Sequence, residues 1–472
     1  MWACGLVALL VYMGFGPQGL RDGRVHAWNV YHYWLGAKYQ HELGYFDMYE
    51  QTLAAWREAG SAPGEALRYR DLRTYELKPT PPGPPLVRSP RWTDARWMEF
   101  QQDLAALAPQ MAPQGWTFVI RDRGYNASPA WSVPARWVTE GLDLGSPHHL
   151  RLAKSVDMVL VLAALAALTV AFGPLRSVVA IWVALLVWNN PTRFLGSFIQ
   201  YDWLALVLCA AAAVKTRRHG VAGALLGAAT VLRVFPAVFL AGMLARAALD
   251  ALTDRALPPW APRLVGGFAL ALVLGVGLGA AGPRGLDAWD EWSDKVTIHN
   301  HHHKAGEARV GLAHIFGSRS LELRPRAPRV EQRQANIAEA RPLRYAVAAL
   351  LLGLLATACW RRDELDCFVL AVVAFFVLTV SSRYYWSALA LLPLLGARRE
   401  DRFSLGVGMG AAVFLTASYY LFCQRLSPHA WVRWRLQNVI MLATFLALTA
   451  SVAWRSFERG TEGSSAPGSV AR

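Results

Sequence analysis

The sequence predicts an all-α membrane protein, with about 12 transmembrane helices and a large helical first outer loop. Apolar runs recur along the 472 residues, and charged residues make up only 17% of the chain, against roughly 25% in soluble domains. One long polar segment, residues 17–154, follows the first apolar run. Lys and Arg gather in short segments beside the later runs. These patterns are typical of a polytopic protein with one loop large enough to form a site.

The first apolar run, Trp2 to Gly16, is interpreted as the first transmembrane helix. Eleven further helices are predicted from the later runs, several of them shorter than the ~20 residues that a full span needs. They cover residues 155–173, 176–189, 201–214, 219–232, 235–249, 264–282, 343–360, 365–380, 383–397, 404–423 and 432–454.

A break is predicted where Arg233 precedes Val234, Phe235 and Pro236, because proline interrupts the helical hydrogen-bond ladder. Two short helices meeting at this turn are expected. The alternative is one long kinked helix, and span counts from ten to thirteen fit the pattern.

The basic residues also predict an orientation, because cytoplasmic loops carry an excess of Lys and Arg. With both ends of the chain inside, nearly every compact basic cluster is cytoplasmic, including Lys215 to Arg218 and Arg398 to Arg402. The net charge of +15 is therefore attributed to membrane orientation rather than to nucleic-acid binding. The predicted organisation is helix 1 at 1–16, an extracytoplasmic loop with amphipathic helices at 17–154, helices 2–7 at 155–282, a second extracytoplasmic loop at 283–342, helices 8–12 at 343–454 and a disordered cytoplasmic tail at 455–472.

Two segments carry a family resemblance. The first runs from His26 to Tyr49 and ends in Gly44-Tyr45-Phe46-Asp47-Met48-Tyr49. The second, Gly220 to Arg246, has a glycine-rich helix and an Arg-x-x-Pro turn. Both resemble the GT-C superfamily of polytopic glycosyltransferases, and the second is similar to members that use polyprenyl-phosphate-mannose, in which Arg233 would match a basic residue before the proline.

The resemblance implies a GT-C-like bundle that transfers a hexose such as mannose from a polyprenyl-phosphate donor to an extracytoplasmic lipid or glycan acceptor. It also implies a multi-pass protein of a bacterial plasma membrane, surrounded by membrane lipids, with its site on the outer face. No cofactor is expected.

The catalytic base is left open between two acids. The acidic position that GT-C enzymes place before the first loop helix is not clearly filled, since Asn29 and His32 stand there and Asp22 lies upstream. Asp122, within the polar stretch Arg121 to Pro129, is the second candidate. The reaction needs one carboxylate to take the proton of the acceptor hydroxyl. Either acid could instead be a solvated loop residue that caps a helix or forms an ion pair.

Basic side chains on the same predicted face are candidates for holding the donor phosphate. Arg193, Arg233 and Arg383 stand at span ends, where an isolated charge is expensive, and Tyr384 is placed to flank a sugar or isoprenoid. In the second loop, His299, His303 and Lys304 are expected to contact phosphate. A metal is a weaker interpretation of this histidine run, because adjacent His side chains do not converge easily on one ion. The three arginines and these second-loop groups are predicted to surround one cavity, with His32 also contacting substrate.

The alternatives come from two other functional classes. A transporter or flippase of lipid-linked sugars should show internal repeats and charges at mid-span, and neither is evident. A non-catalytic membrane scaffold would not require arginines gathered on one face. A nucleotide-driven pump is disfavoured because the sequence has no G-x-x-x-x-G-K motif.

Overall fold

The computed structural model describes residues 25–60, 68–80, 87–111, 115–188, 196–303, 305–319, 328–360, 362–427 and 429–462. Within these ranges the protein is predominantly helical, which confirms the predicted helical class, and its strands form only two short antiparallel pairs. The predicted helix from Trp2 to Gly16 and the residues after 462 lie outside the described part of the chain.

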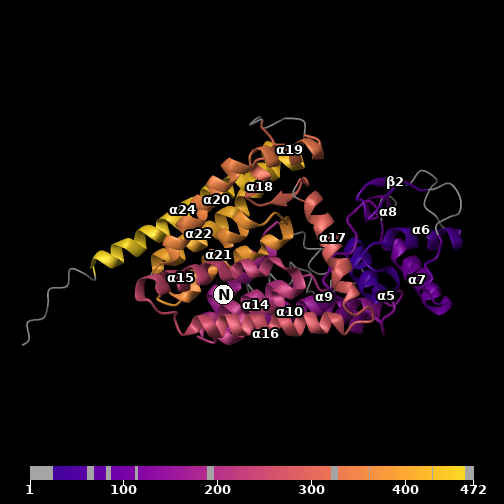
Figure 1. The fold of residues 1–472 in the computed structure, drawn as a ribbon, viewed down its shortest axis with the longest axis horizontal. Helices are drawn as coiled ribbons and strands as arrows, with labels where there is room; N and C mark the ends of the chain where they lie inside the picture. Colours follow the sequence, from indigo (N-terminus) through magenta and orange to yellow (C-terminus); the bar gives the residue numbers. More distant parts are fainter. Residues whose placement is uncertain are drawn as a thin grey trace, which may run out of the picture.

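Two helical parts meet along one boundary. Figure 1 shows a lobe formed by the early, indigo part of the chain at one end of a larger bundle, with α17 running along the junction. The lobe has its own buried core, rich in Tyr and Trp, and the bundle has a second core that is mainly aliphatic.

The lobe consists of short helices and one hairpin. They are α3 (Ala27–Asn29), η2 (Val30–Leu35), α4 (Gly36–Lys38), α5 (Gln40–Leu43), α6 (Met48–Glu58), β1 (Arg68–Arg70), β2 (Leu77–Pro79), α7 (Asp94–Leu107), η3 (Ala108–Gln110), α8 (Gly115–Val119) and α9 (Pro129–Thr139).

Helix α7 illustrates how the lobe forms. The Thr93 side chain accepts a hydrogen bond from Arg96 N, and so caps the first turn. Trp97, Phe100 and Leu104 then lie on one face at helical spacing and are buried. The lobe also buries an ion pair, in which Lys38 Nζ lies 2.8 Å from Asp103 Oδ2. This pairing offsets the desolvation of both charges.

The bundle contains the longer helices. They are α10 (Pro147–Phe172), α11 (Pro174–Leu186), α13 (Asp202–Lys215), α14 (His219–Arg233), η4 (Phe235–Leu240), α15 (Ala241–Asp254), α16 (Trp260–Ala280), α20 (Arg341–Cys359), α21 (Glu364–Leu378), η5 (Arg383–Leu394), α22 (Arg402–Ser418), η6 (Tyr419–Cys423), α23 (Gln424–Leu426) and α24 (Ala430–Glu462). Between α16 and α20 lie α17 (Asp287–His303), β3 (Arg309–Val310), α18 (Leu312–Ile315) and α19 (Val330–Glu339), and β4 (Ser381–Ser382) precedes η5.

Each apolar stretch predicted from residue 155 onward coincides with helical structure. Six helical segments within the described ranges are long and apolar enough to cross a membrane: Pro147–Phe172, Phe235–Asp254, Trp260–Ala280, Arg341–Cys359, Arg402–Leu426 and Ala430–Phe457. Others are shorter, and α21 is enclosed by the bundle along most of its length. The total of about twelve spans stays a prediction.

The predicted break after Arg233 is confirmed. Helix α14 ends there, Val234 has a φ of 60°, and the chain restarts as η4 with Pro236 in its first turn. A positive φ is uncommon for a β-branched residue. The turn therefore places the Arg233 side chain at a helix end, close to the lobe.

Backbone contacts connect the lobe and the bundle beside this turn. His26 N donates to Gly196 O, and Asn29 Oδ1 accepts a hydrogen bond from Phe198 N at 2.7 Å. From the bundle side, Asp157 on α10 accepts hydrogen bonds from the backbone N–H groups of Gln200 and Tyr201. The segment 196–201 is thus held from both sides.

Candidate functional site

Asp122 lies in the loop between α8 and α9, at the junction of the lobe and the bundle. Its amide donates to Val119 O, which closes the turn after α8, and Ser128 caps the start of α9 by accepting from Trp131 N. Trp28 Nε1 donates to Asp122 Oδ2 at 2.7 Å. No described Lys, Arg or His nitrogen lies within 4.0 Å of the Asp122 carboxylate in an ion pair. Among the described residues, the Asp122 carboxylate is therefore bonded by an indole N–H and by no cation.

A group of basic side chains surrounds the same region. Arg123 follows Asp122, Lys295 and His299 lie one turn apart on α17, and Arg309 is in β3. The pKa of His299 is held well below 6.5 by burial and by the positive charges of Arg123, Lys295 and Arg309, so these groups lie close enough to act on it. Basic side chains from three segments of the chain are therefore gathered beside Asp122.

Lys295 is the most enclosed member of this group. Its side chain is fully buried, and Nζ has no hydrogen-bond partner among the described residues. The ammonium group lies 4.7 Å from the centroid of the Tyr75 ring and 5.8 Å from that of Phe46. Burial lowers the pKa of Lys295 to about 7, an effect that Asp122 opposes and the nearby Arg70 and Arg123 reinforce. A buried amine without a bonded partner can accept an anionic ligand.

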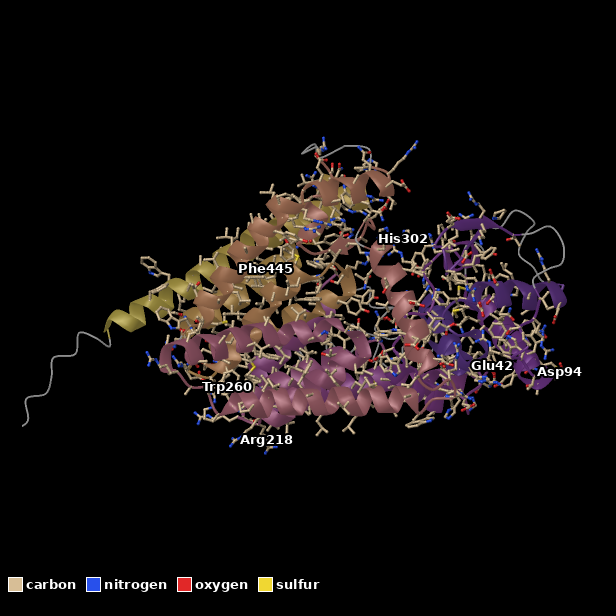
Figure 2. All side chains as sticks on the ribbon, in the orientation of Figure 1. Glu42, Asp94, Arg218, Trp260, His302 and Phe445 are labelled. Carbon is tan, nitrogen blue, oxygen red and sulfur yellow. The ribbon has the colours of Figure 1, made fainter. Side chains whose placement is uncertain are left out.

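Tyr75 connects the lobe to α17. Its hydroxyl lies 3.0 Å from His299 Nδ1 and donates to Arg123 O at 3.3 Å. Its ring also stacks on His302, with centroids 5.1 Å apart. Figure 2 labels His302 where α17 faces the lobe. These contacts fix α17, and with it Lys295 and His299, beside the Asp122 loop.

Arg309 approaches from the bundle. Strand β3 pairs with β4 so that Arg309 is opposite Ser382, and Arg309 Nη1 donates to Ser382 Oγ at 3.2 Å. Its Nε has no hydrogen-bond partner among the described residues. Burial lowers the pKa of Arg309 to about 10, and Arg123 adds to this shift, whereas Tyr384 and Asp122 oppose it. At neutral pH Arg309 remains a cation.

The part of the chain that matches a known family lies in the bundle. Residues 149–382 match the family model described as glycosyltransferase family 87. The chain is a membrane glycosyltransferase of the GT-C type. No curated protein matches the chain significantly. The matched residues run from α10 to β4 and include Arg233, Lys295, His299 and Arg309, while Asp122 and the rest of the lobe precede them. The match does not favour the transporter alternative.

Several predicted site residues of the glycosyltransferase lie outside the described part of the chain. These are Asp22, Arg193 and Lys304, and the side chain of His303. The predicted cavity shared by three arginines therefore stays a prediction.

Arg233 is engaged inside the glycosyltransferase. Its Nη2 atom lies 3.5 Å from Asp202 Oδ1 and donates to Ile199 O at 3.0 Å. Its guanidinium lies 5.5 Å from the centroid of the Tyr33 ring and 5.4 Å from that of Trp131. Arg233 is thus held between lobe aromatics and a bundle carboxylate.

His32, Arg383 and Tyr384 are placed near the other groups. His32 is buried and bonded to Trp28 O and to the Tyr49 hydroxyl, each at 2.8 Å. Arg383 and Tyr384 start η5, directly after the strand that pairs with β3, and the Tyr384 ring lies 4.4 Å from that of Tyr385.

Four residues of this candidate site are not among those predicted from the sequence: Arg123, Lys295, Arg309 and Tyr75. Arg123 stands within the polar stretch Arg121 to Pro129, and Lys295 lies four residues before His299, so the signal was present. In the second loop, the prediction names His299, His303 and Lys304 instead. The burial of Lys295 against Tyr75 depends on residues more than 200 positions apart in the chain, which no local pattern shows.

Proposed function

We propose that the protein transfers a hexose such as mannose from a polyprenyl-phosphate donor to a lipid or glycan acceptor, with Asp122 as the base. The observation that supports this proposal is that Asp122 lies beside a group of basic residues: Arg123, Lys295, His299 and Arg309. The Asp122 carboxylate itself has no bonded cation among the described residues. A glycosyl phosphate needs both a base and cations, because charge grows on the leaving phosphate.

The proposed reaction uses these groups in two roles. The Asp122 carboxylate takes the proton from the acceptor hydroxyl as its oxygen forms a bond to the anomeric carbon. The bond from that carbon to the phosphate oxygen breaks, and the polyprenyl phosphate leaves with the electron pair. Lys295, Arg309 and Arg123 stabilise the charge on the leaving phosphate. The neutral His299 ring contributes a hydrogen bond.

The orientation of the protein in the membrane is part of this proposal. The site faces the outer side of a bacterial plasma membrane, and the lobe and the second loop are extracytoplasmic. The excess of basic residues in the short loops at the other ends of the helices supports this orientation. Arg233, Arg383 and Tyr384 line the path of the sugar or the isoprenoid, and Asp22 remains the alternative base.

The decisive test replaces each candidate base in turn. Asp122→Asn is expected to reduce kcat by about a thousandfold or more, within the range typical of a lost general base, and to leave donor binding close to that of the wild type. Asp94→Asn is the matched control, because Asp94 is exposed at the outer edge of the lobe, away from α17 (Figure 2). Transfer is measured with purified protein and a panel of polyprenyl-phosphate sugars.

Two results would contradict the proposal. Wild-type turnover in Asp122→Asn, with loss of turnover in Asp22→Asn, would move the base to Asp22. No transfer from any donor in the panel, together with movement of lipid-linked sugar across vesicles, would support a flippase instead.

A further inference from the structure

A closed circuit of hydrogen bonds holds the loop that carries Asp122. Trp28 Nε1 bonds to Asp122 Oδ2, and the amide of Gly124, two residues further on, bonds to the Tyr49 hydroxyl at 2.9 Å. The same hydroxyl bonds to His32 Nε2, and His32 Nδ1 bonds to the backbone carbonyl of Trp28. The circuit begins and ends on Trp28.

With a neutral His32 ring, the chemistry of the groups fixes the direction of every bond. A carbonyl oxygen can only accept, so His32 Nδ1 carries the proton that is donated to Trp28 O. In the neutral ring Nε2 is then an acceptor, and the Tyr49 O–H donates to it. The Tyr49 oxygen accepts from Gly124 N, and the Trp28 indole can only donate to Asp122. Burial lowers the pKa of His32 and so favours the neutral ring, which in this arrangement is the Nδ1–H form.

The observed shape of the loop requires glycine at position 124. Gly124 has a φ of +70°, and a Cβ atom there would lie 2.6 Å from Leu72 Cδ1. Besides the bond from the Tyr75 hydroxyl to Arg123 O, two bonds of the circuit hold the loop, one at the Asp122 carboxylate and one at the Gly124 amide. Both bonds lead back to a single helical turn, Trp28 to His32.

We propose that His32 and Tyr49 are positioning residues that fix the Asp122 carboxylate for catalysis and do not themselves contact substrate. The inference rests on the proposed role of Asp122 as the base. Trp28 occupies Oδ2, so Oδ1 is the oxygen that receives the proton of the acceptor. Loss of the circuit loosens the loop between residues 122 and 124, and a carboxylate displaced by about 1 Å can lower the rate by about a hundredfold.

Two neighbouring tyrosines provide a matched test. Tyr31 and Tyr49 are both buried, and their rings stack with centroids 6.3 Å apart. The Tyr31 hydroxyl bonds to Thr52 Oγ1 at 2.8 Å and has no part in the circuit. Tyr49→Phe is expected to lower kcat by about 10- to 100-fold, with the KM for the donor within about twofold. Tyr31→Phe should leave both constants within about twofold of the wild type, because it removes a similar buried hydroxyl elsewhere.

Variants of His32 give a second, graded readout. Asn places an amide near the Nδ1 position and can still donate to Trp28 O, whereas Gln places an amide near Nε2 and can still accept from Tyr49. Both are expected to keep more turnover than His32→Ala, which breaks both bonds. A general packing defect would not separate these variants in kcat while the donor KM stays constant. Folding is checked by size-exclusion chromatography and thermal unfolding of each purified variant.

The outcomes separate this inference from the proposed function. If Asp122→Asn is inactive but Tyr49→Phe and His32→Ala retain wild-type kcat, the positioning role is wrong and the base assignment stands. If Asp122→Asn keeps wild-type turnover, the base assignment fails and the inference fails with it. If Tyr49→Phe does not fold, the order of kcat in the His32 variants decides, and equal rates in all three would overturn the inference.

Discussion

Lys295 shows how a single buried residue can couple ligand binding to pH. Its ammonium group lies between two aromatic rings, without a hydrogen-bond partner among the described residues, and its pKa is about 7. Burial favours the neutral amine. A phosphate bound beside the amine would favour the charged form, so its pKa is higher with donor bound than without donor. Binding therefore takes up a proton at pH values above 7.

The sign of the expected pH dependence follows from this difference. Donor affinity is greatest below pH 7 and falls by up to about tenfold per pH unit above it, until the pKa of the bound state is reached. Lys295→Met is expected to weaken binding by about tenfold or more at pH 6, because a charge-assisted hydrogen bond is lost, and to make affinity nearly independent of pH between 7 and 8.5. Donor affinity can be measured by isothermal titration at several pH values. Arg218→Gln, an exposed change in the bundle far from α17 (Figure 2), serves as the control, and a steep pH dependence that survives in Lys295→Met would contradict the prediction.

At the scale of the elements, glycines allow α14 and α16 to pack closely. A Cβ atom at Gly223 would lie 1.9 Å from Leu264 O, and one at Gly267 would lie 2.1 Å from Gly220 O. Backbones can approach this closely only where side chains are absent, as is common between membrane helices. The close contact helps to hold α14 in place, and Arg233 stands at the end of that helix.

This packing predicts opposite effects of the same substitution at two glycines. Gly223→Ala should lower the free energy of unfolding by about 1–3 kcal/mol, because the helices must separate to admit the methyl group. Gly266→Ala, on α16 with no neighbouring atom within 4 Å, should be neutral or stabilising by up to about 1 kcal/mol, since alanine is the better helix former. Thermal unfolding in detergent or nanodiscs measures both. Equal shifts in the unfolding temperature of the two variants would show that the close contact between α14 and α16 does not contribute to stability.

At the scale of the whole molecule, the segment 196–201 couples the lobe to the bundle. Asn29 in the lobe bonds to Phe198 N, and the fully buried Asp157 on α10 bonds to the amides of Gln200 and Tyr201. Asp202 follows directly and pairs with Arg233. Asp122, the proposed base, sits on the lobe and Arg309 sits on the bundle, so their relative position depends on this joint.

Asp157→Asn tests the joint. The amide retains one acceptor oxygen, and its NH₂ group would face a backbone N–H that it cannot bond, so unfolding should become easier by about 1–3 kcal/mol. A fall in kcat is also expected, because the lobe and the bundle would be less rigidly aligned. Asp143→Asn, at an exposed lobe position, is the control. If Asp157→Asn unfolds more easily but transfers sugar at the wild-type rate, the joint serves stability alone.

What the sequence by itself determined is the membrane-helical class, the position of the helices and the break at Arg233. Each depends on residues close together in the chain: apolar runs that fill a helical span, and a proline that cannot donate to the ladder. The polar stretches around Asp122 and His299 could be singled out for the same reason. Their roles could not be assigned, because a polar loop residue looks the same in the sequence whether it is solvated or enclosed.

Only the tertiary structure decided which of these groups meet. The indole of Trp28 reaches a carboxylate 94 residues away, and Tyr75 meets His299 across 224 residues. Such contacts depend on how the lobe and α17 pack together, and burial by that packing is what lowers the pKa of Lys295. A short-range sequence pattern cannot predict these contacts or the lowered pKa, because long-range packing and desolvation exist only after the chain has folded.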